Sequence, residues 1–144
     1  MNSDLRLRYQ RQLIYAGLDD FTPNGVFPAY LGGRDGHNVA EWKREVVAFL
    51  KVSTQRGAVK IVNWNNLFSS LEPVNLDNLM LADEKKGNAR LDEDIVWNSL
   101  YFFGTDSLIK DLERFGLLDW DALMLPERVD FINFIQDKYR IVFS

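Results

Sequence analysis

The chain has 144 residues, no cysteine and a net charge of −4 at pH 7. This length is typical of one domain, so we expect residues 1–144 to form a single domain. The lack of cysteine excludes disulfides, cysteine-ligated zinc and thiol nucleophiles. The sequence shows no leader-like apolar run after Met1 and no run near the ~18–20 apolar residues that span a bilayer, so we expect a cytoplasmic location and no membrane contact.

The N-terminal region predicts a helix followed by an apolar loop. Apolar side chains recur at helical spacing over residues 3–16, with Ser3 or Asp4 as the N-cap and Gly17 at the end. Residues 19–37 contain two prolines and several glycines, which argue against a regular element. Their many apolar side chains favour a loop that packs onto the core as a lid or collar.

The next segment predicts the best-defined helix and a short strand. Residues 38–54 begin with Asn38, which can cap the helix, and Glu41 stands three positions on as in a capping box. Apolar residues then follow one helical face. Residues 58–62 are short and rich in β-branched side chains, so they predict a strand.

The remainder of the chain predicts a series of helices, at residues 64–71, 75–83, 92–103, 106–115 and 126–139. Pro126 marks the start of the last one. Residues 141–143 are expected to form a strand, with residues 58–62 as the proposed partner. The fold class is therefore mainly α (α+β): a compact domain of five to seven helices with at most a small two-stranded sheet.

Charge divides the chain into two unequal halves. Residues 1–60 hold nine Lys or Arg and six Asp or Glu, whereas residues 61–144 hold eight and fifteen. Such a split is often found where two surfaces attract different partners, and charges scattered over solvated faces explain it equally. The expected contact residues for a basic partner are Asp92, Glu93, Asp94, Asp111, Glu113, Asp119, Asp121 and Trp120. Trp64, Trp97 and Tyr101 are further aromatic anchor candidates, since Trp and Tyr are favoured at interfaces, although we expect most of these aromatic residues to belong to the core.

No pattern in the sequence specifies a reaction, so we expect no catalytic residue, no metal and no cofactor. The paired acids at Asp92 and Asp119 lack the Gly and Glu of an EF-hand loop. The expectation is a non-catalytic protein-binding module. In size and charge it resembles small bacterial immunity or inhibitor proteins, which neutralise a basic toxin by electrostatic complementarity.

One short motif offers an alternative. Residues 104–108 read Gly-Thr-Asp-Ser-Leu and fit the G-x-D-S-L signature of acyl carrier proteins. The resemblance implies that Ser107 carries phosphopantetheine and that the acidic segment to Glu113 docks partner enzymes. The expected helix reaches Gly116 after only nine residues, shorter than in that family. An ordinary cap at Thr105 or Asp106 explains the same residues.

Two weaker sites involve basic residues. Arg34 and His37 lie in a glycine-rich turn before a helix and can hold an anion there, although the Lys-Ser/Thr of a P-loop is missing. A regulatory DNA-binding role would use Arg6, Arg8, Arg11, Lys43, Arg44, Lys51, Arg56 and Lys60. The isoelectric point of about 5.0 and the acids between these residues argue against nucleic acid.

Overall fold

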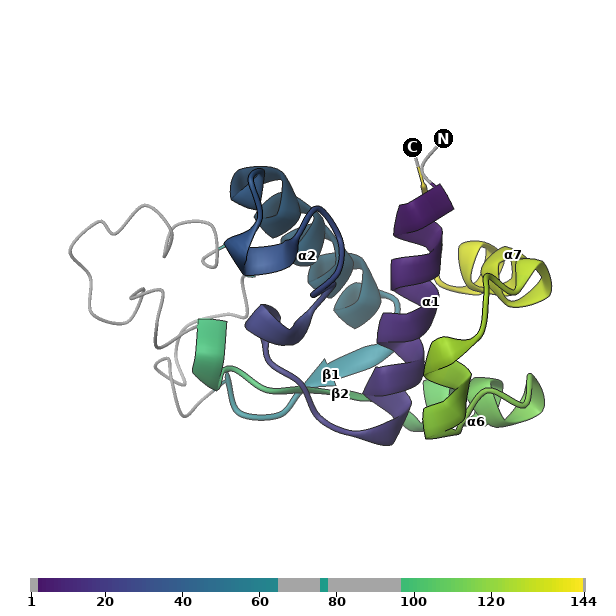
Figure 1. The fold of residues 1–144 in the computed structure, drawn as a ribbon. Helices are drawn as coiled ribbons and strands as arrows, with labels where there is room; N and C mark the ends of the chain where they lie inside the picture. Colours follow the sequence, from purple (N-terminus) through teal and green to yellow (C-terminus); the bar gives the residue numbers. More distant parts are fainter. Residues whose placement is uncertain (1–2, 65–75, 78–96, 144) are drawn as a thin grey trace.

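The computed structural model describes residues 3–64, 76–77 and 97–143. It is mainly helical, with one small two-stranded antiparallel sheet, which confirms the predicted fold class (Figure 1). The helices predicted at residues 64–71 and 75–83 lie outside the described residues except for residues 64 and 76–77. Of the helix predicted at 92–103, residues 92–96 lie outside the described residues, and residues 97–99 are helical.

Helix α1, Ser3–Leu18, runs two residues past its predicted end. Ser3 and Asp4 lie within the helix and not before it. Gly17 lies inside the helix and does not end it. Its lack of a side chain leaves room for α6. A Cβ at Gly17 would lie 2.5 Å from the Leu112 Cδ1 atom, so only glycine fits at this crossing without a shift.

The loop after α1 packs onto the core, as predicted. It contains two short 3₁₀ helices, η1 (Pro23–Gly25) and η2 (Gly33–Asp35). Most of its apolar residues are buried, namely Phe21, Val26, Phe27 and Tyr30, whereas Leu31 is exposed. The indole nitrogen of Trp42 donates a hydrogen bond to the Phe27 carbonyl over 2.9 Å, which fixes the loop to the next helix.

Helix α2, Val39–Gln55, confirms the prediction for this segment. The Asn38 side chain accepts a hydrogen bond from the Glu41 amide, and the predicted apolar face is buried. Strand β1, Val59–Ile61, follows. It pairs antiparallel with β2, Phe102–Gly104, with Val59 opposite Gly104 and Ile61 opposite Phe102.

Two expectations about the sheet were wrong. The partner of β1 is residues 102–104 and not residues 141–143, which form no regular element. The sequence predicts a helix through residues 102–103, because the aromatic run before Gly104 is equally consistent with a helical and a strand periodicity, whereas these residues belong to β2. Phe21 decides the outcome: its amide and carbonyl both bond Phe102 from the side opposite β1, so Phe102 requires an extended backbone.

The C-terminal part contains α6 (Asp106–Arg114), η4 (Trp120–Met124) and α7 (Val129–Lys138). Helix α7 begins three residues later than predicted from Pro126. Gln10 of α1 explains the delay, because its buried side chain holds residues 126–128 extended. Gln10 Nε2 donates to the Pro126 carbonyl over 3.0 Å, and Gln10 Oε1 accepts from the Arg128 amide over 2.7 Å.

Helix α1 lies at the centre of the fold. It packs against β2, η4, α6 and α7, so the first helix contacts mainly the last third of the chain (Figure 1). Its residue Tyr9 contacts three aromatic rings, those of Phe27, Phe49 and Phe143, at centroid distances of 5.0–5.1 Å. The buried hydrophobic residues of the described part form a single cluster, to which Tyr9 and the other buried residues of α1 belong.

Candidate functional site

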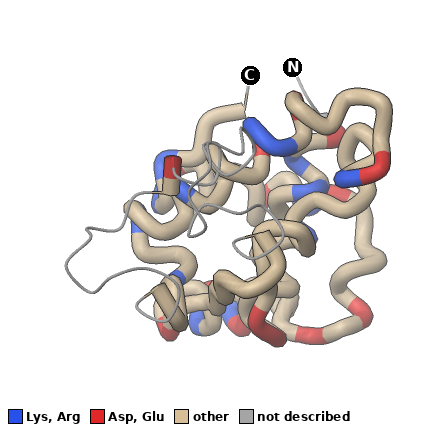
Figure 2. The backbone as a smooth tube through the Cα atoms, turned by 90° about the vertical axis from the view of Figure 1, so that its left-hand side faces the viewer, with Lys and Arg blue, Asp and Glu red and all other residues tan. Residues whose placement is uncertain are grey.

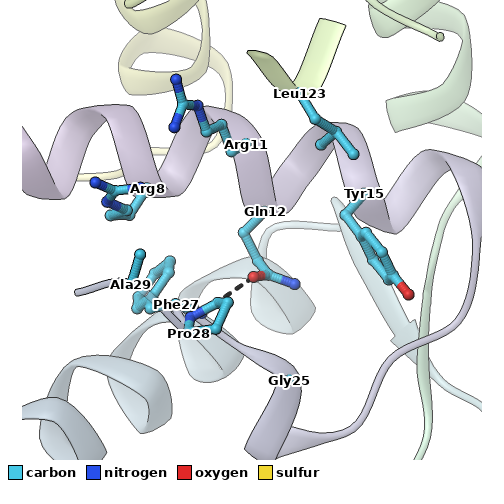
Figure 3. Close-up of a pocket in the computed structure, with 9 residues that line it drawn as sticks. All are labelled: Arg8, Arg11, Gln12, Tyr15, Gly25, Phe27, Pro28, Ala29 and Leu123. Carbon is cyan, nitrogen blue, oxygen red and sulfur yellow. Dashed lines mark hydrogen bonds between the residues drawn. The ribbon is translucent and has the colours of Figure 1, made fainter. Parts of the chain in front are cut away.

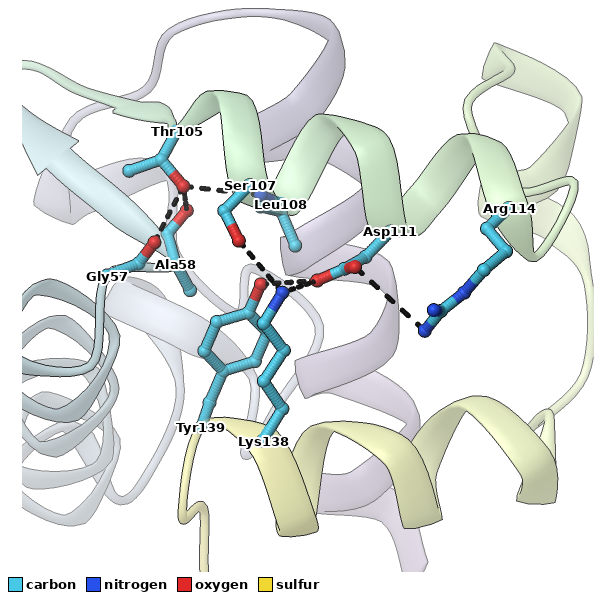
Figure 4. Close-up of polar contacts among 9 residues, drawn as sticks. All are labelled: Gly57, Ala58, Thr105, Ser107, Leu108, Asp111, Arg114, Lys138 and Tyr139. Atoms are coloured by element: carbon cyan, nitrogen blue, oxygen red, sulfur yellow. Dashed lines mark hydrogen bonds and ion pairs between the residues drawn. The ribbon is translucent and has the colours of Figure 1, made fainter.

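Ser107, the residue singled out by the carrier-like motif, lies in a polar cluster between α6 and α7 (Figure 4). Lys138 Nζ donates to Ser107 Oγ over 2.8 Å and to Asp111 Oδ2 over 2.6 Å. The hydroxyl of Tyr139 donates to the same carboxylate oxygen over 2.7 Å. Thr105 caps α6 by accepting a hydrogen bond from the Leu108 amide.

The cluster is built to join two helices. Asp111 is 7 % exposed and Tyr139 is 1 % exposed, so both polar groups are removed from water and satisfy each other. Burial, followed by the hydrogen bond to Asp111, raises the pKa of Tyr139 well above its ordinary value. Lys138 of α7 bonds both Ser107 and Asp111 of α6, so these contacts join the two helices.

The carrier hypothesis stays a prediction. The Ser107 side chain is exposed at the start of α6, which spans only nine residues. Its hydroxyl is engaged by Lys138, so attachment of a phosphopantetheine arm at this oxygen would have to break that bond. Mass spectrometry after incubation with a phosphopantetheinyl transferase tests this directly.

The predicted acidic contact residues fall into three groups. Asp92, Glu93 and Asp94 lie outside the described residues. Asp111 is buried in the cluster above and presents no free carboxylate. Glu113, Asp119 and Asp121 are exposed, and within the described part of the chain they form no ion pair.

Ion pairs engage several other acids of the second half. Lys51 pairs with Asp77, Arg6 with Glu127, and Arg128 with Asp130. The hydrogen bond from Arg128 holds the pKa of Asp130 below its usual range. Figure 2 shows several acidic positions along the lower edge of that view and many of the Lys and Arg higher up. Some acids of the second half are therefore neutralised by ion pairs, and others are exposed to solvent.

Trp120 is the exposed tryptophan among the predicted anchors. It is 53 % exposed in η4 and packs edge-to-face on Tyr15 of α1, with ring centroids 5.7 Å apart. Met124 and Leu125, four and five residues after Trp120, are also exposed, at 80 % and 38 %. The Asp119 carboxylate caps η4 by accepting from the Asp121 amide over 2.8 Å. We call residues 119–125 the η4 surface.

The other aromatic candidates differ in exposure. Trp64 and Trp97 are buried, and Trp97 packs against Trp42 at 5.7 Å between ring centroids. Tyr101 is 39 % exposed beside β2. Two of the proposed anchors are therefore part of the core, whereas Trp120 and Tyr101 reach the surface.

The two residues of the predicted anion site, Arg34 and His37, lie in different surroundings. His37 is exposed, whereas Arg34 is half-buried and lies over the rings of Trp42 and Trp97, at 5.3 and 4.9 Å from their centroids. Arg34 also donates to the Asn24 carboxamide oxygen. Its guanidinium thus supports the packing of the loop, and anion binding here remains a prediction.

Several basic residues proposed for DNA contact have partners within the protein. Arg8 donates to Asp4, Arg11 to the Leu125 carbonyl, and Arg44 to Glu41. Lys43 is 8 % exposed and lies over the Trp97 ring. A phosphate-binding face needs accessible cations in one place, and this arrangement offers few of them.

Sequence reasoning missed the buried amides of Gln10 and Gln12 on α1. Both side chains are covered by other segments of the chain. The only sign in the sequence is that an uncharged polar residue stands among the apolar positions of the helix. Among the described residues, no group of three or more His, Cys, Asp or Glu side chains is placed to hold a metal ion. Of the helices in this part of the chain, none combines the length and apolar character needed to cross a bilayer.

Comparison with known proteins gives no match: no family model fits the chain, and neither a curated protein nor a solved structure resembles it significantly.

Proposed function

We propose that this protein is a non-catalytic protein-binding module that uses the η4 surface to contact a partner with a basic face. The observation that carries the proposal is the exposure of Trp120 together with Met124 and Leu125 in one short segment. Contiguous exposed apolar groups rimmed by polar ones are typical of interaction sites.

Trp120 has the properties of an interface anchor. Tryptophan is enriched among the few residues that dominate binding energy, because its large ring buries much area with little conformational entropy to lose. Tyr15 already orients the ring from one side. A partner that covers the remaining face would bury an apolar group whose conformation is set in advance.

The charge around this segment favours a basic partner. The exposed carboxylates of Asp119 and Asp121 stand on either side of Trp120 in the chain and have no ion-pair partner among the described residues. Exposed charges of one sign speed the association with an oppositely charged surface and reject like-charged ones. A small acidic protein that covers a basic site acts as an immunity or inhibitor protein does, and we propose this class of role.

The test is partner capture with matched variants. Tagged wild-type protein and the Trp120→Ala and Asp119→Asn/Asp121→Asn variants are used as bait in extracts of the source cell. Val142→Ala is the control, since Val142 is 84 % exposed and apolar but outside the η4 surface. We expect a basic protein to be retained by wild type and Val142→Ala, released by raised salt, and lost with Trp120→Ala. Equal recovery with Trp120→Ala, or no specific partner for the wild type, contradicts the proposal.

A further inference from the structure

A cavity of about 310 Å³ opens between α1, residues 25–29 and η4 (Figure 3). The apolar part of its wall comes from Tyr15, Phe27, Pro28, Ala29 and Leu123. Its polar part comes from one face of α1, where Arg8, Arg11 and Gln12 stand at helical spacing. An apolar hollow with a few fixed polar groups is the usual form of a small-molecule site.

Gln12 lines this space and carries a hydrogen-bond donor without a partner among the described residues. Its Oε1 atom accepts from the Phe27 amide over 3.1 Å, and because an N–H needs an acceptor, this bond fixes which end of the carboxamide faces Phe27. The Nε2 atom is left on the other side, buried and without a partner among the described residues. Gln12 is only 5 % exposed, and a buried amide donor usually has an acceptor.

Arg11 and Arg8 give the same wall a positive charge. Arg11 is anchored by a hydrogen bond from its Nη2 atom to the Leu125 carbonyl over 3.1 Å. Its Nε atom is buried and, like the amide of Gln12, has no acceptor within the described part of the chain. Arg8 is held by Asp4 through its own Nε atom over 3.1 Å. The unsatisfied groups in the wall are thus both donors.

We propose that this cavity binds a small organic acid, whose carboxylate balances the one positive charge that remains after Arg8 pairs with Asp4, and accepts hydrogen bonds from the unsatisfied donors. Arginine is well suited to carboxylates because its planar N–H groups match two oxygens. The apolar body of the acid would pack against Phe27, Pro28 and Leu123. At about 30 Å³ per water-sized group, the cavity holds on the order of ten non-hydrogen atoms, which fits an arylalkanoic or short-chain alkanoic acid.

The test uses isotope-labelled protein titrated with 3-phenylpropanoate and with hexanoate, followed by proton–nitrogen correlation spectra. The readouts are the side-chain NH₂ of Gln12, the Nε–H of Arg11 and the backbone amide of Phe27. We expect saturable shifts of these signals with a dissociation constant on the order of 1 mM or tighter. The neutral 3-phenylpropanamide should bind at least about tenfold more weakly, because it lacks the charge.

Two variants make the result specific. Gln12→Glu keeps an acceptor for the Phe27 amide but places a carboxylate oxygen where the donor stood, so it should repel the acid. Ala29→Leu fills the cavity from an exposed position in the loop after α1. Both should reduce affinity at least about tenfold, with the Phe27 amide signal reporting that the fold is kept.

Three results would overturn the inference: no saturable shift with either acid, equal affinity for the neutral amide, or wild-type affinity in both variants. The measurement uses the isolated protein, so its outcome is independent of whether the η4 surface has a protein partner.

Discussion

The hydroxyl of Tyr139 donates a hydrogen bond to Asp111 Oδ2 over 2.7 Å, and both side chains are buried. Tyr139 directly follows α7, and Asp111 lies in the middle of α6, so this bond ties the two helices together at the core. Lys138 Nζ reaches the same carboxylate oxygen from the outer side. A charge that would be costly to bury alone is therefore compensated by two donors.

Replacing Tyr139 with Phe should lower the free energy of unfolding by about 1.5–3 kcal/mol, the range for a hydrogen bond to a charged group. The change removes one oxygen and leaves the aromatic packing in place. Chemical denaturation of the wild type and the variant measures the difference. A companion Asp111→Ala variant and the double variant complete a cycle, and additive effects of the two changes would show that the bond contributes nothing.

Stability should fall at alkaline pH because of two buried tyrosines. Burial raises the pKa of Tyr139, helped by its bond to Asp111, and it raises the pKa of Tyr9, helped by the charge of Glu45. Above about pH 10 the unfolded chain loses these protons while the folded protein keeps them. The free energy of unfolding should then decrease by about 1.4 kcal/mol per pH unit for each tyrosine.

Denaturation curves collected between about pH 8 and 11 test this dependence. Below pH 10 the two groups are protonated in both states and contribute no slope. Tyr139→Phe should show a shallower decrease than the wild type, because one of the two groups is gone. A variant slope equal to that of the wild type would contradict the assignment to Tyr139.

Gly104→Ala should destabilise the protein by about 1–3 kcal/mol through overpacking. A Cβ at this position of β2 would lie 2.8 Å from the Ala16 carbonyl oxygen, and a backbone atom of α1 cannot move aside as a side chain can. Gly25→Ala is the control, because its Cβ would meet only the Thr22 hydroxyl at 4.0 Å. Thermal melts should separate the two variants, and equal melting temperatures would refute the close contact.

Thr105→Ala should cost about 1–2 kcal/mol, the usual effect of losing an N-cap. The Thr105 hydroxyl accepts from the Leu108 amide over 3.2 Å and donates to the Gly57 carbonyl over 2.6 Å, so it joins α6 to the turn before β1. Thr105→Ser preserves both bonds and should stay within about 0.5 kcal/mol of the wild type. A serine variant as unstable as the alanine variant would argue against the capping role.

The sequence predicted elements whose signals are local. Helix α2 has a capping residue, an apolar face and a glycine soon after its end, and all three act within a few residues. The cap at Thr105 and the short α6 were predictable for the same reason. The packing of Phe21 and Phe27 onto the core followed from their apolar character in a loop rich in proline and glycine.

Features set by distant segments could not be predicted. The assignment of residues 102–104 to β2 depends on Phe21, about eighty positions earlier, and the late start of α7 depends on Gln10. The sequence predicts Asp111 as an exposed contact residue because its charge can be read from the sequence, whereas its burial depends on α7. The cavity beside Gln12 is formed by three segments, and no single stretch of sequence contains its pattern.

The two hydrogen bonds between Gln10 and residues 126–128 have a consequence for biosynthesis. Helix α1 is translated before the groups that satisfy its buried amide, which lie more than a hundred residues later in the chain. Contacts between such distant segments form slowly, since a long loop must close before they do. The side of α1 that faces β2, α6 and α7 therefore stays exposed, and accessible to chaperones, until these later elements have been synthesised.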